Sequence, residues 1–115
     1  MRPAWRVSLL EMYTPFGWLE LDEANANQVR EKLANLESMK WKELIGYRNH
    51  FIKASELCKE AQDHLVAIQQ DDIDSVMSLG VTQKSRVVGI MEHNILKLLW
   101  WDPEHLVCPV ETPNT

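Results

Sequence analysis

The alternation of apolar and polar positions is clearest near the C-terminus, where two apolar runs flank His93-Asn94. Both runs are rich in β-branched and aromatic residues, and Asn tolerates the left-handed conformation that a tight hairpin turn needs. We therefore predict a β-hairpin within residues 84–105. Its second strand leads into a polar exit that contains Pro103 and His105.

A two-residue turn at this position fixes which side chains share a face of the hairpin. One face is apolar and is expected to lie on the core; it pairs Met91 with Leu96, Gly89 with Leu98, and Val87 with Trp100. The opposite face is expected to mix two cations with an indole; it pairs Arg86 with Trp101, Val88 with Leu99, and Ile90 with Lys97.

Helical periodicity predicts two helices before the hairpin. Asp22 is the expected N-cap of the first, over residues 23–39, because a short acidic side chain accepts from the free N–H groups of a first turn. Residues 40–45 either extend this helix or form a short turn, which ends at Gly46. The second helix is expected from a cap at Ser55 to about Gln70.

Two further strands and a C-terminal extended segment complete the expected elements, at residues 50–54, 76–81 and 106–110. The fold class is therefore α+β, with an N-terminal helix followed by β-α-β-β-β and an antiparallel sheet. We expect a single domain with three parts: an irregular arm plus helix over 1–46, a core over 47–110, and a tail over 111–115.

Composition narrows the class of protein. With 115 residues and a net charge of −5, the chain is suited to one soluble domain and not to broad, non-specific nucleic-acid binding, although a local basic patch stays open. Cys58 and Cys108 are expected to be reduced thiols. No targeting signal or membrane span is convincing, so we expect a cytoplasmic protein with no membrane partner.

The sequence lacks the motifs of several enzyme classes. It has no His-Glu-x-x-His, no glycine-rich phosphate loop and no Gly-x-Ser-x-Gly. The acidic run Asp71, Asp72 and Asp74 is better explained by helix caps and solvated charge than by a cation site. We therefore expect no metal and no cofactor.

The polar exit and the mixed face of the hairpin carry the candidate chemistry. His105 is a candidate general acid or base, with Glu104 or Asp102 tuning its pKa; a solvated loop histidine is the alternative. Arg86 beside Trp101 would suit RNA, where phosphate contact and base stacking combine. The same pair is also compatible with a structural cation–π contact. His64 is expected to be a packing residue.

The order strand, helix and three antiparallel strands in residues 47–110 resembles the RelE/ParE superfamily of small bacterial toxins. Within it, residues 84–90 (Lys-Ser-Arg-Val-Val-Gly-Ile) are similar to the strand in which mRNA-cleaving members place a catalytic arginine. The resemblance implies a metal-independent endoribonuclease that acts on ribosome-bound mRNA and is silenced by an antitoxin protein. Arg86 matches the arginine, and His105 lies near the position of an acid/base group.

The ending Trp-Trp-Asp-Pro-x-His, at residues 100–105, also looks like that of uncharacterised products of mobile elements and integron cassettes. The leading hypothesis is a RelE-like toxin or toxin relative. Its catalytic residues are Arg86 and His105, and its substrate-binding residues are Lys84, Lys97 and Trp101.

Two other hypotheses stay open. One is a non-catalytic binding or assembly module that forms a homo-oligomer. In the other, the aromatic arm over residues 1–21 covers the face that carries Arg86 and Trp101, in the place of an antitoxin.

Overall fold

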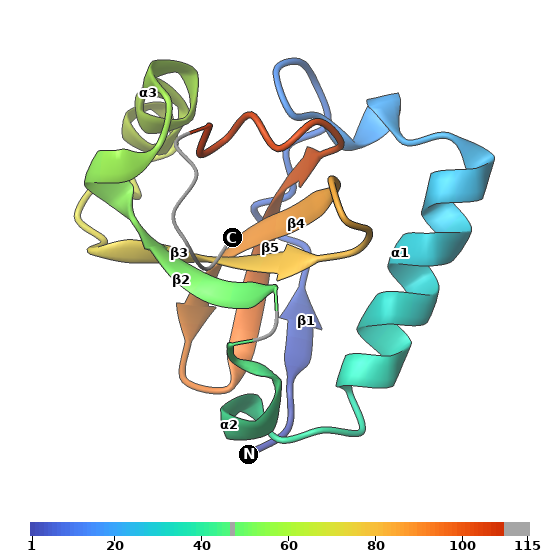
Figure 1. Cartoon of the computed structure of the whole chain (residues 1–115). Helices are drawn as coiled ribbons and strands as arrows, with labels where there is room; N and C mark the ends of the chain where they lie inside the picture. The colour runs from blue at the N-terminus through green and yellow to red at the C-terminus, as the bar shows by residue number, and fades with distance from the viewer. Residues whose placement is uncertain (47, 110–115) are drawn as a thin grey trace.

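A five-stranded mixed sheet forms the centre of the protein, in a computed structural model that describes residues 1–46 and 48–109 (Figure 1). The strands follow the order β1-β5-β4-β3-β2 across the sheet, and β1 is parallel to β5 whereas the other neighbours are antiparallel. Their bounds are β1 Ala4–Arg6, β2 Asn49–Lys53, β3 Ser75–Gly80, β4 Arg86–Glu92 and β5 Ile95–Asp102.

Helices cover both faces of this sheet. The helices are α1 Glu23–Leu36, α2 Trp41–Leu44 and α3 Lys59–Ala67, with 3-10 turns η1 Trp18–Glu20 and η2 Ala54–Glu56. The predicted cap of α1 is confirmed, because the Asp22 carboxylate accepts the backbone N–H of Asn25 at 2.8 Å. The cap predicted at Ser55 is wrong, since Ser55 lies in η2 and α3 begins after Cys58.

The α+β class is confirmed, but the wholly antiparallel sheet is wrong. The segment taken for an irregular arm contributes β1, which pairs in parallel with β5 from Ala4↔Ile95 to Arg6↔Lys97. Three residues are too few to show a period in the sequence. No strand is assigned over residues 106–109; Val110 and the predicted tail lie outside the described residues.

Two hydrophobic clusters lie on opposite faces of the sheet, so the expected division into one core face and one mixed face outside the core is wrong. Under α3, the cluster includes Ala61, Leu65, Val88, Ile90 and Trp100. Under α1 and α2, it includes Val29, Trp41, Val87, Leu98 and Trp101. Covering both faces buries apolar side chains from successive positions of one strand.

A β-bulge at Leu99 causes the difference in register. The predicted pairs Met91↔Leu96, Gly89↔Leu98 and Ile90↔Lys97 are confirmed. Between Val88 and Gly89 the register shifts, because Leu99 is an extra residue on β5. The remaining pairs are consequently Val88↔Trp100, Val87↔Trp101 and Arg86↔Asp102, and each of the three predicted partners is one residue off.

The N-terminal arm closes the edge of β5 at this bulge. The Leu99 carbonyl accepts the backbone N–H of Glu11 at 2.9 Å and the indole N–H of Trp18 at 3.1 Å. The Trp101 N–H donates to the Phe16 carbonyl at 3.0 Å. The arm thus satisfies the backbone groups that a bulge and an edge strand leave unpaired. Within the described residues, no helix has both the length and the apolar content needed to cross a membrane.

Candidate functional site

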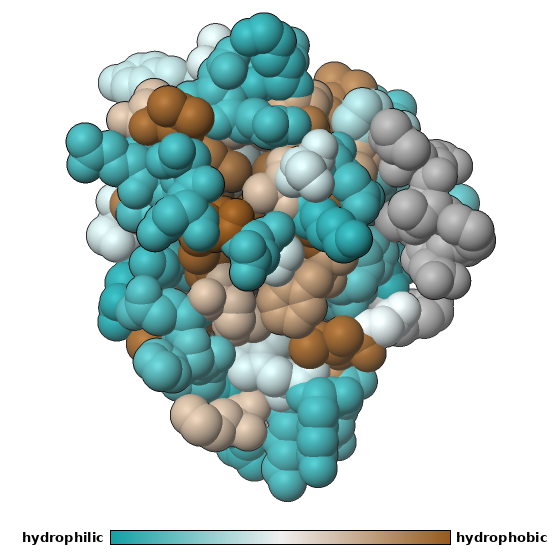
Figure 2. All heavy atoms as spheres, turned by 90° about the vertical axis from the view of Figure 1, so that its left-hand side faces the viewer, coloured by the Kyte–Doolittle hydropathy of each residue, from teal (hydrophilic) through white to brown (hydrophobic). Residues whose placement is uncertain are grey.

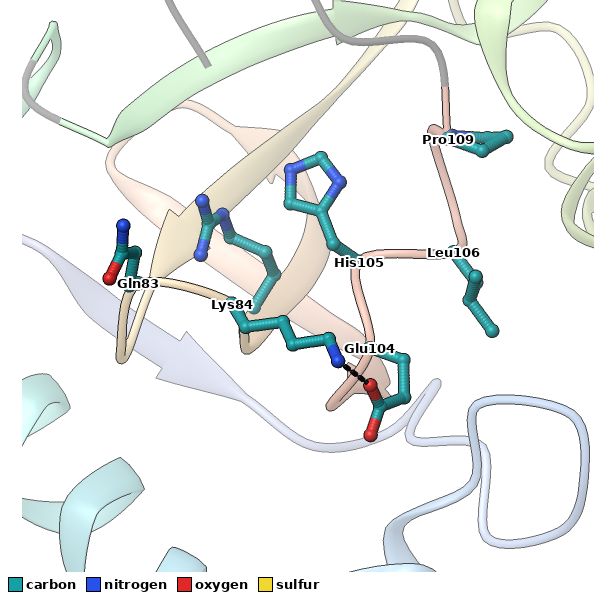
Figure 3. Close-up of a pocket in the computed structure, with 7 residues that line it drawn as sticks. Gln83, Lys84, Glu104, His105, Leu106 and Pro109 are labelled. Atoms are coloured by element: carbon teal, nitrogen blue, oxygen red, sulfur yellow. Dashed lines mark ion pairs between the residues drawn. The ribbon is translucent and has the colours of Figure 1, made fainter.

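A cavity of about 560 Å³ opens where β4 begins, between the β3–β4 turn and the residues that follow β5 (Figure 3). It is lined by Gln83, Lys84, Arg86, Glu104, His105, Leu106 and Pro109. Three of the predicted site residues therefore meet here, namely Lys84, Arg86 and His105. The two sides of the cavity come from segments about twenty residues apart in the sequence, joined by the β4–β5 hairpin.

Arg86 is held in place by the turn that precedes it. Its side chain is among the buried polar groups, and Nη1 donates to the carbonyls of Thr82 at 2.8 Å and Ser85 at 2.9 Å. The turn is itself closed by the Thr82 and Ser85 hydroxyls, which lie 2.6 Å apart. Burial, and then the charge of Arg48, lower the pKa of Arg86. The guanidinium is thus a pre-oriented cation at the wall of the cavity.

Asp102 organises the opposite wall. Its two carboxylate oxygens accept the backbone N–H groups of Leu106 and Val107, each at 2.9 Å. This closes a tight turn in which His105 adopts a φ of 60°. Burial raises the pKa of Asp102, and the two hydrogen bonds oppose that shift. Asp102 therefore positions the histidine through the backbone.

An ion pair between Lys84 and Glu104 joins the two walls at the solvent side of the cavity (Figure 3). Glu104, one of the two residues predicted to tune the pKa of His105, makes this contact with Lys84. Both side chains are largely exposed, so the pair adds little to stability. Its consequence is local, since an anion that approaches Lys84 competes with Glu104.

The structure does not bring Lys97 and Trp101 into this site. Lys97 lies toward the other end of the hairpin, where Nζ contacts Glu92 Oε2 at 3.0 Å. Trp101 is only 1% exposed and packs against Trp18. The expected Arg86–Trp101 platform is therefore wrong, because the bulge at Leu99 turns Trp101 to the other face. The arm covers Trp101 but not the cavity, whose described lining comes entirely from residues 83–109.

Sequence reasoning missed a group of cations around Arg86. Burial, and then the charges of Arg48 and Arg86, lower the pKa of Lys32. Burial, Arg86 and His105 lower the pKa of His50 in that order. His50 Nδ1 is buried without a hydrogen-bond partner in the described part of the chain. These residues come from α1 and β2, so only the fold shows that they are neighbours.

A separate polar cluster, formed by Glu11, His64 and Trp100, attaches the arm to α3. His64 Nδ1 receives the indole N–H of Trp100 at 2.6 Å, and His64 Nε2 lies 2.7 Å from Glu11 Oε2. Because an indole nitrogen only donates, Nδ1 is the acceptor and Nε2 carries the proton toward Glu11. His64 packs against Trp100 as expected, and it also ties the arm to the sheet.

The residues that the structure describes contain no cluster of three or more His, Cys, Asp or Glu side chains arranged to hold a metal ion. Cys58 and Cys108 are not joined in a disulfide. Burial raises the pKa of the Cys58 thiol.

A family model described as "Uncharacterised protein UU032" matches residues 21–115. The chain belongs to this family. No curated protein and no solved structure matches the chain. The matched range contains every residue that lines the cavity and also Lys32, Arg48 and His50, whereas β1 and most of the arm precede it.

Proposed function

We propose that this protein is a RelE-like, metal-independent endoribonuclease that cleaves mRNA in the cavity between the β3–β4 turn and the turn after β5. The observation that supports this proposal is the convergence of Lys84, Arg86 and His105 on one opening. A cationic guanidinium beside an imidazole meets the two needs of RNA cleavage, which are stabilisation of phosphate charge and proton transfer.

The proposed chemistry uses the RNA itself as the nucleophile. The 2′-oxygen attacks the adjacent phosphorus and the bond to the 5′-oxygen breaks, while one proton leaves the 2′-hydroxyl and another reaches the departing oxygen. His105 exchanges a proton in this step as acid or base. Arg86, fixed by the carbonyls of Thr82 and Ser85, stabilises the charge that builds on the phosphate oxygens, and Lys84 supports it.

Two partners follow from this proposal: ribosome-bound mRNA as the substrate, and an antitoxin protein that silences the enzyme. The net charge of −5 restricts the expected RNA contact to the basic group around Arg86 rather than to the whole surface. Specificity for mRNA on the ribosome then depends on which segment of the bound mRNA reaches the cavity.

Induction of the wild type in bacteria, together with cleavage of ribosome-bound mRNA in vitro, tests the proposal. We expect growth arrest and cleavage by the wild type. His105→Gln should lower the cleavage rate by roughly two to four orders of magnitude. Arg86→Lys, which keeps the charge but loses the fork of donors, should also cleave more slowly.

Lys97→Gln is the matched control, since it removes a cation far from the cavity. Its cleavage rate should equal that of the wild type. Circular dichroism of each variant separates loss of activity from loss of fold. Absence of both arrest and cleavage in the wild type would refute the nuclease function.

An apolar recess favours a second candidate function, a binding module that assembles as a homo-oligomer. It has a volume of about 340 Å³ and lies beside the outer strand β2. Its lining includes Ile45, Met91 and Phe51, whose exposed fraction is 46%. On the side of the molecule where β2 and α3 lie, apolar side chains show in separate patches among hydrophilic ones (Figure 2).

The occupant proposed for this recess is β2 of a second copy, because outer strands with exposed apolar side chains pair readily. Light scattering over a concentration series measures the assembly. A dimer that Phe51→Lys converts to monomer would support it, and a wild-type monomer at high concentration would exclude it.

A further inference from the structure

Gly80 brings two arginines together at one end of the sheet. Its backbone N–H donates to the Arg48 carbonyl at 2.8 Å, and its Cα pairs with that of Arg86 on the other side. Arg48, Gly80 and Arg86 thus form a row across the ends of three neighbouring strands. Two strand spacings separate the arginine backbones by about 10 Å.

The side chains of this row lie on one face of the sheet. A Cβ atom on Gly80 would lie 2.7 Å from Arg48 Cβ and 3.5 Å from Arg48 Cδ, so the aliphatic part of Arg48 fills the space that Gly80 leaves open. Gly80 and Arg86 are opposed in the antiparallel ladder, so a Cβ on Gly80 and the side chain of Arg86 point to the same face. The aliphatic part of Arg48, which covers Gly80 just before β2 begins, therefore lies on the same face as Arg86, next to the cavity that Arg86 lines.

This arrangement holds like charges close together in an acidic protein. The charge of Arg48 acts on both Arg86 and Lys32, and Lys32 joins the group from α1. His50 is opposed to Ser78 of β3, two residues before Gly80, and so faces the same side, where its buried Nδ1 has no hydrogen-bond partner among the described residues. A bound polyanion would lower the repulsion among these cations.

We propose that Arg48 and Arg86 form a clamp across Gly80 that binds two consecutive phosphates of single-stranded RNA, with Arg86 at the phosphate in the cavity and Arg48 at its neighbour. This proposal rests on the proposed function and names the substrate as an oligonucleotide rather than a mononucleotide. Gly80 is the positioning residue, because any side chain there would displace Arg48.

Binding of a short single-stranded 2′-O-methyl oligoribonucleotide, which cannot be cleaved through its 2′-oxygen, tests the clamp. Fluorescence anisotropy gives the affinity over a series of salt concentrations. Arg48→Gln should weaken binding roughly tenfold, as expected when a charge-assisted hydrogen bond is lost. It should also reduce the slope of log K against log salt by about 0.7, the value for one phosphate contact on a single strand.

Binding of a dinucleotide with a single phosphate distinguishes the contribution of Arg86 from that of Arg48. Arg86→Gln should weaken binding of both probes, whereas Arg48→Gln should leave the dinucleotide affinity within twofold of the wild type. Lys53→Gln is the matched control, because it removes a charge at the opposite end of β2 and should change neither affinity nor slope. A purely structural role for Arg48 would not produce a probe-dependent loss.

The outcomes distinguish the two proposals. If Arg48→Gln behaves like Lys53→Gln while Arg86→Gln loses binding, the clamp is wrong and the proposed active site stands. If neither arginine variant loses binding, both proposals are wrong. If both arginine variants lose binding as expected but the wild type cleaves no RNA, the clamp stands as a binding site and the nuclease function fails.

Discussion

Asp102 lies directly across the sheet from Arg86, yet its carboxylate binds the backbone N–H groups of Leu106 and Val107. Arg86 Nη1 in turn donates to the carbonyls of Thr82 and Ser85. Each member of this opposed pair therefore fastens its own wall of the cavity. Asp102 shapes the turn that carries His105, and the guanidinium of Arg86 stays directed at the opening of the cavity.

Replacement of Asp102 by Asn should loosen the turn after β5. An amide offers one acceptor oxygen, and its NH₂ group opposes the second backbone N–H, so we expect a loss of about 1–3 kcal/mol in the free energy of unfolding. Urea denaturation at neutral pH measures the change. Asp63→Asn is the control, since Asp63 makes an exposed pair with Lys59. Equal stability of the two variants would contradict the role of Asp102.

Replacement of Lys32 by Gln should stabilise the protein by a few tenths of a kcal/mol at neutral pH, since the side chain is partly solvated and the repulsion is screened. The folded-state pKa of Lys32 lies below 10.5, mainly through burial and then Arg48 and Arg86. As the pH rises, Lys32 therefore loses its proton at a lower pH in the folded protein than in the unfolded chain. The destabilisation that the charged Lys32 causes is fully present below the folded pKa and disappears as the pH rises to 10.5.

Denaturation of the Lys32→Gln variant and the wild type at neutral pH and near pH 10 tests this sign. The gain should shrink at the higher pH. Lys42→Gln, at an exposed position of α2, should show no such gain. A destabilised Lys32→Gln variant would mean that this lysine has a net favourable contact in the fold.

Acidification should destabilise the wild type in part through His50. Burial, Arg86 and His105 lower its pKa from 6.5, so the unfolded chain takes up the proton first. The loss of stability due to His50 begins as the pH falls through about 6.5 and is complete below the pKa of His50 in the folded protein. His50→Gln should lose less stability than the wild type over this interval. The same dependence in both proteins would exclude this contribution, and His93→Asn in the exposed turn serves as the control.

Replacement of Trp18 by Phe should weaken the attachment of the arm. The phenyl ring keeps much of the packing on Trp101 but cannot donate to the buried Leu99 carbonyl, so we expect a loss of about 1 kcal/mol. Trp5→Phe is matched to it, because the Trp5 indole donates to Glu37 at an exposed position and its loss should cost less. Thermal or urea denaturation ranks the two; a larger cost for Trp5→Phe would contradict the expected order.

Local patterns predicted the hairpin turn, the cap at Asp22 and the α+β class because each depends on residues near in sequence. Alternation placed β4 and β5 correctly up to Leu98 and failed beyond it, since one extra residue reverses every later position. Arg86, Lys84 and His105 were predicted from the hairpin and its exit. Arg48 was not, because its link to Arg86 runs through Gly80 on a third strand.

The bulge at Leu99 has a consequence for comparing members of this family. Trp100 packs under α3 and Trp101 under α1 and α2, and not the reverse, because one residue is inserted before them. A relative that lacks this residue would present each indole to the wrong helix layer, even if both tryptophans were kept. The length of β5, more than the identity of its aromatic residues, is therefore the character by which sequences sharing this architecture should be aligned.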